Sequence, residues 1–247
     1  MSKKNGKDFY SVPFLKKVGW LFYGFLEKIG LMKRITEKPL RVFVKKYGNN
    51  SKTLNIGAGK TTFEEFFPNQ TTLDVEVRPD MQIDIIADAH DLSEIQNNSY
   101  ETILCTEVLE HLHTPHLAIS EMYRILKPGG LLLLTTRFIF PLHSSPVDYY
   151  RFTKYGLRHL LKDFEILELS EDSNTMETIA ILCQRIAIQT KTLWFKPFKL
   201  IWFILASIMR YLNFLITSEY SDGRYNVKEK NILASGYLVA AIKNNDN

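Results

Sequence analysis

Short apolar runs alternate with longer mixed stretches between Lys52 and the end of the chain. Runs of this length that stop at Gly, Asp or a polar loop are typical of strands separated by helices. The fifth run opens with four consecutive leucines, as expected for a strand that is covered on both faces. The pattern predicts an α/β fold with a mainly parallel sheet. The predicted strands are Thr53–Ile56, Thr71–Val75, Ile83–Ala87, Tyr100–Cys105, Leu131–Thr136, Phe164–Leu169 and Gly236–Ile242.

Apolar residues with helical spacing lie between these runs. Thr114–Leu126 has this spacing, and Lys127–Gly130 is expected to end the helix. Thr153–Lys162 is a second predicted helix, and another is expected directly after Gly59. Residues 176–216 are hydrophobic and helix-prone, so we expect a helical insert at about residues 174–217, before the last strand.

The first fifty residues have a different pattern. Phe14–Ile29 is predicted to be an amphipathic helix, and Leu40–Tyr47 a second, short helix. Because Lys16 and Lys17 interrupt the apolar positions, we expect no secretory signal sequence. The chain is therefore divided into a basic amphipathic helical segment, residues 1–50, and one α/β domain, residues 51–247.

Charge is segregated along the chain, although the formal net charge is only +4. Residues 1–50 carry a net +9, residues 51–184 a net −10 and residues 185–230 a net +5. Basic ends suit nucleic acid or an anionic membrane surface. The lysines of these ends are interleaved with aliphatic stretches and no RNA-binding motif is present, so we expect no nucleic-acid partner. Two cysteines, Cys105 and Cys183, exclude a disulfide scaffold and a four-cysteine zinc site.

Residues that suit ligand binding lie at three consecutive strand ends. Gly57-Ala58-Gly59 follows the first strand, where a glycine pair either lets the backbone approach a ligand or simply makes a tight turn. Asp74 ends the second strand, where a carboxylate can accept hydrogen bonds from ribose hydroxyls. Asp88 follows the third strand and can accept from an adenine amino group. Because the carboxyl ends of parallel strands meet at one edge of the sheet, the three features together predict a ligand site there.

With these motifs the sequence resembles the class I S-adenosylmethionine (SAM)-dependent methyltransferases. It is most similar to the methyltransferase type 11-like subgroup, which includes quinone-biosynthesis methyltransferases. The resemblance covers about Lys52–Leu169 and the closing strand, and it is carried by Leu54–Gly59, Leu73-Asp74, Ala87–Leu92, Glu107–Leu112 and Arg124–Gly130. The chain departs from the family pattern at three positions, where an acid, a third glycine and a proline are usual: Asn55, Thr61 and Arg137.

The resemblance implies a Rossmann-like, doubly wound sheet of seven strands in the order 3-2-1-4-5-7-6, with strand seven antiparallel. It also implies SAM as the cofactor. In this family the glycine loop passes under the methionine moiety, the acid of the second strand holds the ribose, the third strand end contacts the adenine, and the fourth strand end lines the pocket. The implied cofactor-binding residues are, in that order, Gly57, Ala58, Gly59, Asp74, Asp88, Ala89, His90, Cys105, Thr106 and Glu107.

Pro141–Thr153 follows the fifth strand, so it is expected to lie over the transferred methyl group. Methyl transfer to a hydroxyl requires an aligned acceptor and the removal of a proton. His143 is the candidate base, and Asp148 either orients it or binds the acceptor. The alternative is a loop braced by its prolines and by an Asp148–Arg151 ion pair. The candidate substrate-binding residues are Tyr149, Tyr150 and Arg151.

A metal site is a further hypothesis. Some O-methyltransferases acting on vicinal hydroxyls have a similar Glu-x-x-Glu-His motif and a later His, which hold a divalent cation. The matching residues here are Glu107, Glu110, His111 and His143. Carboxylate and imidazole mixtures suit Mg, Mn or Zn. Many metal-free family members share the Glu-His pair, so our main prediction is no metal, with His111 as a local hydrogen-bonding residue.

The insert combines a hydrophobic run with basic and aromatic residues. Phe198–Ile216 contains only Lys199 and Arg210 as charges, and it is shorter than the roughly 20 uninterrupted apolar residues of a membrane-spanning helix. Basic residues beside Trp and Phe favour a helix that lies in the membrane interface. A lid on the sheet or the seam of a homodimer is the alternative.

Together these features predict a SAM-dependent O-methyltransferase that acts on a sugar, a lipid-linked glycan or another amphiphilic acceptor. The alternatives are a quinone- or lipid-type methyltransferase and, in another class, a non-catalytic SAM-binding partner protein at the membrane. We expect a cytoplasmic protein with peripheral contact to the inner face of the cytoplasmic membrane.

Overall fold

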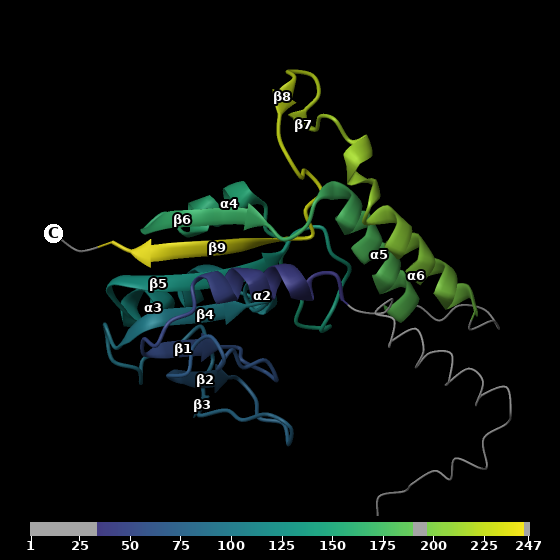
Figure 1. The fold of residues 1–247 in the computed structure, drawn as a ribbon. Coiled ribbons are helices and arrows are strands. Elements are labelled where there is room, and N and C mark those ends of the chain that lie inside the picture. The colour runs from purple at the N-terminus through teal and green to yellow at the C-terminus, as the bar shows by residue number, and fades with distance from the viewer. Residues whose placement is uncertain (1–33, 190–196, 245–247) are drawn as a thin grey trace, which may run out of the picture.

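The computed structural model describes residues 34–189 and 197–244. Seven strands form one sheet in the order β3-β2-β1-β4-β5-β9-β6, in which β9 is antiparallel to both neighbours. This confirms the predicted Rossmann-like order with an antiparallel last strand (Figure 1). The strands of the sheet are β1 (Thr53–Ile56), β2 (Gln70–Asp74), β3 (Ile85–Ile86), β4 (Tyr100–Thr106), β5 (Leu126–Arg137), β6 (Phe164–Glu171) and β9 (Gly236–Lys243).

Strand β5 is longer than its sequence pattern predicts. Helix α3 (Pro115–Ile125) ends close to the predicted position, but Lys127–Gly130, expected to be a turn, already belongs to β5. The pairing register with β4 shifts between Tyr100 and Thr102, which accommodates this extension.

Successive side chains of β5 point to opposite faces of the sheet, so its run of leucines fills two cores. Leu132 and Leu134 pack in the larger core, and Leu133 in the smaller one. The larger core is covered by α3 and by α4 (Lys154–Leu160). The residues of α3 in this core have helical spacing and are all buried: Ala118, Ile119, Met122 and Ile125.

Helix α2 (Glu37–Lys46) covers the other face and confirms the predicted helix at Leu40–Tyr47. It buries Phe43 and Val44 against Leu133 of β5 and Leu104 of β4. The other helix predicted near the N-terminus, Phe14–Ile29, lies outside the described residues.

The helix expected directly after Gly59 does not form, so that prediction is wrong. Residues 57–69 connect β1 to β2, and after Gly59 they make turns in which Phe63 and Phe67 are buried. Phe63 and Phe67 pack beside α2, which occupies this face of the sheet in place of a crossover helix.

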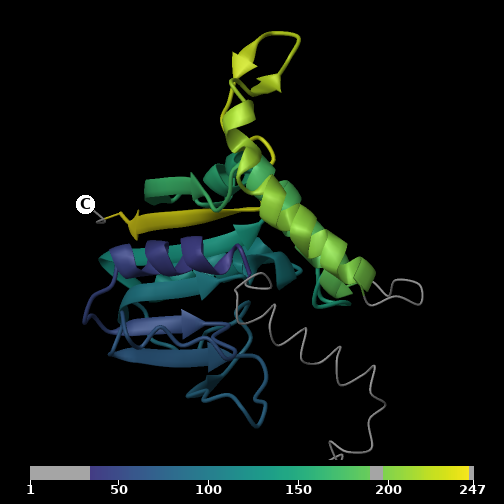
Figure 2. The same ribbon diagram turned by 45° about the vertical axis from the view of Figure 1, so that its right-hand side comes forward.

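The insert is a helical hairpin beyond the carboxyl ends of the parallel strands (Figures 1 and 2). Helices α5 (Thr175–Gln189) and α6 (Pro197–Met209) lie side by side, and α5 packs on Ile35 and Phe140. A short 3₁₀ helix, η3 (Leu212–Leu215), follows. The polar stretch after it forms an exposed two-stranded hairpin that the sequence pattern did not predict, β7 (Tyr220–Asp222) and β8 (Val227–Lys228).

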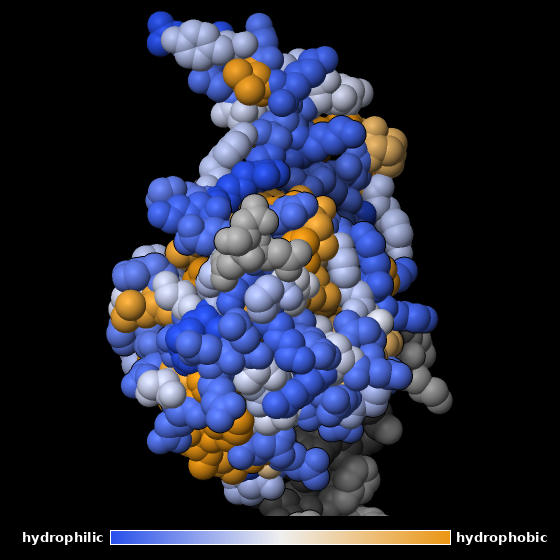
Figure 3. Space-filling view, turned by 90° about the vertical axis from the view of Figure 1, so that its left-hand side faces the viewer, coloured by the Kyte–Doolittle hydropathy of each residue, from blue (hydrophilic) through white to orange (hydrophobic). Residues whose placement is uncertain are grey.

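The side of the molecule opposite the helical hairpin is mostly hydrophilic, with small separated apolar patches (Figure 3). No helix among the described residues is both long enough and apolar enough to cross a membrane.

Candidate functional site

The glycine loop after β1 has the backbone that its residues allow. Gly57 and Gly59 have φ angles of +66° and +53°, a region that side-chain-bearing residues rarely adopt. A β-carbon at Gly57 would also overlap the Cγ2 methyl of Val108. Asn55, which replaces the usual acid, donates from Nδ2 to the carbonyl of Thr61 at 3.2 Å. Gly57 and Gly59 thus allow the turn that the loop makes, and the hydrogen bond from Asn55 to Thr61 ties the loop to β1.

The two predicted acids stand at neighbouring strand ends. Asp74, at the end of β2, accepts a hydrogen bond from Gly59 N at 3.0 Å, so it touches the glycine loop directly. Asp88 accepts from His90 N at 2.9 Å and lies 2.5 Å from His90 Nδ1. The His90 ring stacks on His113, with ring centroids 4.2 Å apart. The structure therefore brings the glycine loop and Asp74 together, and places Asp88, Ala89 and His90 on the next loop of the same edge.

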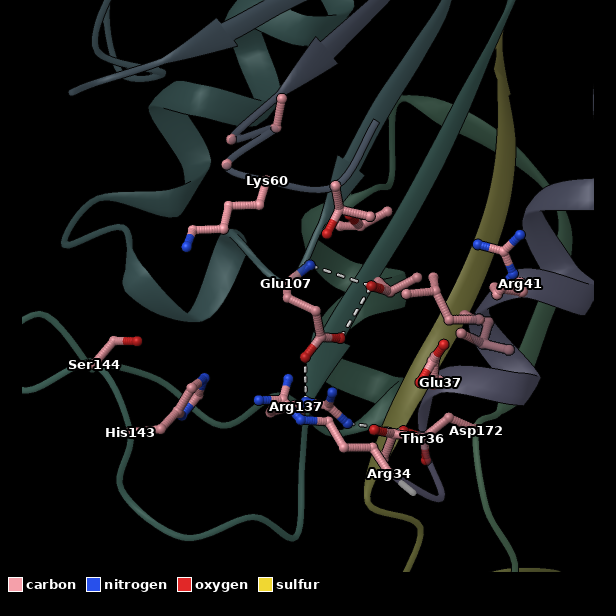
Figure 4. A pocket seen from close by; sticks show the side chains of 18 of the residues that line it. Arg34, Thr36, Glu37, Arg41, Lys60, Glu107, Arg137, His143, Ser144 and Asp172 are labelled. Carbon is pink, nitrogen blue, oxygen red and sulfur yellow. Dashed lines mark hydrogen bonds and ion pairs between the residues drawn. The ribbon is translucent and has the colours of Figure 1, made fainter. Parts of the chain in front are cut away.

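A cavity of about 650 Å³ opens beside the glycine loop. This is a usual size for a small-molecule site. Figure 4 shows several of its side chains projecting from α2, from the ends of β4 and β5, and from the loop after β5. The predicted site residues in its lining are Gly57, Ala58, Gly59, Thr106, Glu107, His111 and His143, whereas Asp74, Asp88, Ala89 and His90 are not part of it.

Cys105 does not belong to this lining, which corrects its predicted place in the pocket. Its side chain is fully buried in the larger core, and burial raises the pKa of the thiol far above its ordinary value. The reason is strand alternation: Thr106 and Glu107 are at the end of β4, whereas Cys105 is directed into the sheet's covered face.

Arg137 stands where relatives often have proline, and it closes one wall of the cavity. Its guanidinium forms ion pairs with Glu107 and with Asp172, the latter at 3.0 Å (Figure 4). Asp172 also accepts hydrogen bonds from Ser235 Oγ and Gly236 N. This buried network links the ends of β4, β5 and β9, so Arg137 is a structural tie between three strands.

The loop after β5 is braced internally by Arg151. All five N–H groups of its guanidinium donate: two to Asp148 at 2.7 Å, and the others to the carbonyls of Phe140, Pro141 and Tyr150. None is left for an acceptor, which corrects the predicted substrate-binding role of Arg151. The Asp148–Arg151 pair lowers the pKa of Asp148 to about 2, so its carboxylate is ionised.

His143 is held at the cavity by the same loop. Its backbone N donates to Asp148 Oδ2 at 2.9 Å, and its Nδ1 lies 3.6 Å from that oxygen. Asp148 therefore positions His143, as one of the two predicted roles requires. Tyr149 and Tyr150 are exposed, and their backbone N–H groups donate to the carbonyl of Glu110. They lie on the outer side of the loop, outside the cavity lining.

Glu110, His111 and His143 converge, with one ligand-type atom from each lying within 4.8 Å of the others. His111 Nδ1 donates to the carbonyl of Val147 at 2.5 Å, which leaves its Nε2 directed toward Glu110. Glu110 Oε2 accepts from Thr136 Oγ1 at 2.8 Å, whereas Oε1 is buried without a hydrogen-bond partner among the described residues. Glu107, the fourth residue of the metal hypothesis, is not part of this group because it pairs with Arg137.

Burial favours the neutral forms of Glu110 and His143 at pH 7. It raises the pKa of Glu110 to about 8, assisted by the charge of Glu107. It lowers the pKa of His143 to about 4, assisted by nearby His111. Glu110 is thus protonated and His143 is a free base. A neutral imidazole at a cavity wall can accept a proton from a bound hydroxyl.

Several charged residues of the cavity wall lie outside the sequence motifs, among them Arg34, Asp172 and Arg185. Arg185 is the only charged residue in the second half of α5, residues 178–189. An isolated charge in an apolar helix is a weak signal by itself. Its position beside the cavity depends on how the α5–α6 hairpin packs, which the sequence pattern does not specify.

Comparisons with known proteins agree with this geometry. Residues 54–134 match a family model described as a methyltransferase domain. The chain is similar to the ubiquinone biosynthesis O-methyltransferase of Xanthomonas oryzae pv. oryzae, with 39% identity over 57 residues, 23% of this chain and 24% of that protein. It is also similar to the thiol S-methyltransferase TMT1B of Rattus norvegicus, with 28% identity over 76 residues, 31% of each chain. The alignments thus span only about a quarter to a third of these relatives.

Two solved structures share the fold over most of this chain. One is the 1,6-didemethyltoxoflavin-N1-methyltransferase of Burkholderia thailandensis with bound S-adenosylhomocysteine, with a TM-score of 0.52 and 11% identity, covering 93% of this chain and 87% of that chain. The other is the phosphoethanolamine N-methyltransferase 2 of Haemonchus contortus with SAM, with a TM-score of 0.51 and 17% identity, covering 84% of this chain and 52% of that chain. At these identities the similarity concerns the fold alone.

Proposed function

We propose that this class I SAM-dependent methyltransferase methylates a hydroxyl oxygen of an amphiphilic acceptor, with His143 as the base that removes the hydroxyl proton. The observation that carries the proposal is that His143 lines the same cavity as the glycine loop. A sugar or a lipid-linked glycan is the acceptor class we favour, and a quinone- or lipid-type acceptor is the alternative. The names of the matched ubiquinone O-methyltransferases support oxygen as the acceptor atom.

The residues present fit the cofactor. Gly57 and Gly59 carry no side chain and line the cavity, and Asp74 touches the loop from the neighbouring strand end. Gly57, Gly59 and Asp74 would hold the methionine and ribose parts, and Asp88 would lie at the adenine. When bound, SAM supplies an electrophilic methyl group. The protein contributes alignment, exclusion of water and proton removal.

We assign proton removal to His143, whose neutral imidazole lies in the cavity wall. Its lowered pKa keeps it unprotonated at neutral pH, and Asp148 and Arg151 fix the loop that carries it. In this scheme Asp148 is a positioning residue.

Calorimetry with SAM and with S-adenosylhomocysteine is the direct test. We expect saturable binding of both by the full chain, followed by transfer of labelled methyl from SAM to hydroxyl-bearing lipid or glycan fractions. If the chain does not bind SAM, the proposed methyltransferase activity is contradicted. Binding without transfer to any hydroxyl acceptor would support the alternative of a non-catalytic SAM-binding protein.

A second part of the proposal concerns the membrane. Helix α6 exposes Ile201, Ile204 and Ile208 at 44–49% of their surface, spaced as one stripe opposite buried Phe203 and Ala206. Lys199 and Arg210 flank the stripe, which suits a surface with anionic headgroups. We propose that this α6 stripe lies in the membrane interface and presents amphiphilic acceptors to the cavity. Membrane contact would also account for the basic, aromatic composition of both ends of the chain.

Replacing Ile201, Ile204 and Ile208 together with serine is expected to lower binding to anionic phospholipid vesicles by about tenfold or more, because their apolar surface no longer enters the interface. Co-sedimentation of the full chain measures this. The matched control is serine at three aliphatic positions elsewhere that are at least as exposed, Val75, Val77 and Ile86. Equal loss in both triple variants would contradict the α6 stripe, and a dimer that only the α6 variant dissociates would support a homodimer seam in its place.

The convergence of Glu110, His111 and His143 favours a second candidate, in which a divalent cation assists the transfer. The orphaned Glu110 Oε1 and the free His111 Nε2 are suitable ligands. Because Glu110 must lose its proton to bind a cation, affinity for Mn²⁺ should rise from pH 6.5 to 8.5, and binding should release protons.

Titration calorimetry of the full chain with Mn²⁺, in buffers of different ionisation enthalpy, measures both effects. We expect Glu110→Gln to abolish the binding and His116→Ala, at an exposed histidine outside the cavity, to leave it unchanged. No Mn²⁺ binding by the wild-type chain would leave His143 acting alone as the base.

A further inference from the structure

Five basic side chains line the cavity, and they differ in whether an acid balances them. Arg41 pairs with Glu65, Lys60 with Asp80, and Arg137 with both Glu107 and Asp172. Arg34 and Arg185 form no ion pair with any acid in the part of the chain that the structure describes. Glu37, the remaining carboxylate of the lining, is exposed and lies beyond ion-pair distance of either arginine. Two guanidinium groups of the cavity thus have no ion-pair partner among the described residues.

Arg185 is the more constrained of the two. Its guanidinium carbon lies 4.4 Å from the centroid of the Phe140 ring, and the guanidinium carbon of Arg137 lies at the same distance from that ring. Two cations therefore share one aromatic ring, which attracts each of them only weakly. Burial lowers the pKa of Arg185 to about 10, and the charges of Arg34 and Arg137 add to this effect. A half-buried arginine that is repelled by two others is in an environment that an anion would stabilise.

The position of this pair points to the acceptor. Phe140, which contacts Arg185, also contacts the His143 ring, with centroids 5.2 Å apart. Arg185 comes from α5 and Arg34 from the segment before α2, so neither belongs to the glycine loop or to the strand ends that would hold the cofactor. Arg34 lies beside Arg137 at the corner of the cavity away from Lys60 (Figure 4). An anionic group held there would be one aromatic ring away from the candidate base.

We propose that Arg185 and Arg34 form a subsite for a phosphate group of the acceptor, which places the hydroxyl of that acceptor at His143. This inference rests on the proposed function and narrows it to phosphorylated acceptors. Guanidinium groups match the planar pairs of oxygens that phosphate presents, and two of them suit its double charge better than the single charge of a carboxylate. The α5–α6 hairpin thereby supplies a specificity residue to the cavity as well as the exposed α6 stripe.

The carboxylate of SAM is another anion that Arg185 and Arg34 are able to bind, so the experiment has two arms. In the first, the full chain saturated with S-adenosylhomocysteine is titrated with inorganic phosphate and with pyrophosphate in a phosphate-free buffer. We expect saturable binding that weakens by about tenfold in Arg185→Gln and in Arg34→Gln. Arg185→Lys should recover part of the loss, because lysine keeps the positive charge but lacks the planar guanidinium that donates to two phosphate oxygens at once. The matched control is Arg224→Gln on the exposed β7–β8 hairpin, which should bind as the wild type does.

In the second arm, the affinity for S-adenosylhomocysteine itself is measured in the same variants. We expect it to stay within about threefold of the wild type, since the cofactor ligands are elsewhere. A loss of S-adenosylhomocysteine affinity that matches the loss of phosphate affinity would assign the pair to the cofactor carboxylate and overturn the proposal. So would equal phosphate binding in Arg185→Gln and Arg224→Gln, or no phosphate binding by the wild type. Phosphate binding without SAM binding would contradict the proposed function and leave the anion subsite standing. Melting curves of each variant identify any that fail to fold.

Discussion

Replacing His143 with alanine is expected to lower kcat for a hydroxyl acceptor by about 10²–10⁴-fold while SAM affinity stays unchanged. Its neutral imidazole lies in the cavity wall, whereas the cofactor loops make no hydrogen bond to it. Single-turnover methyl transfer at saturating SAM measures the chemical step. The matched control is His159→Ala, at an exposed histidine on α4 outside the cavity, which should leave kcat unchanged.

The pH profile separates a base from a merely structural His143. Burial lowers the pKa of His143 to about 4, so the wild-type rate should stay level from pH 7 down to about 5 and fall only as the imidazole becomes protonated near pH 4. The acid limb should be absent from the residual activity of His143→Ala. The same pKa difference affects stability. Between pH 6.5 and pH 4 the unfolded chain binds a proton at His143 more readily than the folded chain does, so the free energy of unfolding decreases as the pH falls through this range. A profile that is unchanged in His143→Ala would contradict the role of base.

Gly57→Ala is expected to weaken SAM binding by about 100-fold or more. The φ of +66° at this position costs an alanine about 1 kcal/mol or more, and its β-carbon would overlap the stiff, β-branched side chain of Val108. The loop must shift to relieve the overlap, and the shift moves the backbone that would support the cofactor. Titration calorimetry with S-adenosylhomocysteine measures the effect.

A second substitution tests this explanation. Val108→Ala removes the overlapping methyl, so the double variant should recover part of the affinity, with the remainder lost to the φ requirement. Gly156→Ala is the control, because a β-carbon there meets only Thr153 Oγ1, at an ordinary 3.4 Å, inside α4. If Gly57→Ala binds as tightly as the wild type with an unchanged melting temperature, the glycine loop does not contact the cofactor.

The sheet could be predicted from the sequence because its strands are short apolar runs, and the segments between them are longer and more polar. The four leucines of β5 predict burial on both faces, and they fill both cores as expected. Gly57 and Gly59 also follow from local chemistry, since a turn with positive φ at both positions requires glycine. The wrong prediction, a helix after Gly59, came from the usual pattern of such folds. The residues after Gly59 make turns instead, and α2, from before the first strand, covers that face.

The site was only partly derivable, for a physical reason. Thr106, Glu107 and His143 reach the cavity because each follows a strand whose end is set by local pattern. An arginine in this loop is chemically suited to bind a substrate, but all five N–H groups of Arg151 donate to residues of its own loop. Those hydrogen bonds depend on how residues 140–151 fold back on themselves. Cys105 lies one position before the pocket-lining residues, but strand alternation turns it into the core.

By itself, the sequence determined the α/β class, the strand order through its family motifs, the glycine loop and the loop that carries His143. These features depend on contacts between near neighbours, on strand periodicity and on the φ angles that glycine allows. The tertiary structure alone decided which charges meet: Arg137 with Asp172, Glu110 with His111 and His143, and Arg185 with no acid among the described residues. Charge pairing between segments far apart in the chain depends on packing geometry at the scale of a few ångströms, and a one-dimensional pattern does not contain that geometry.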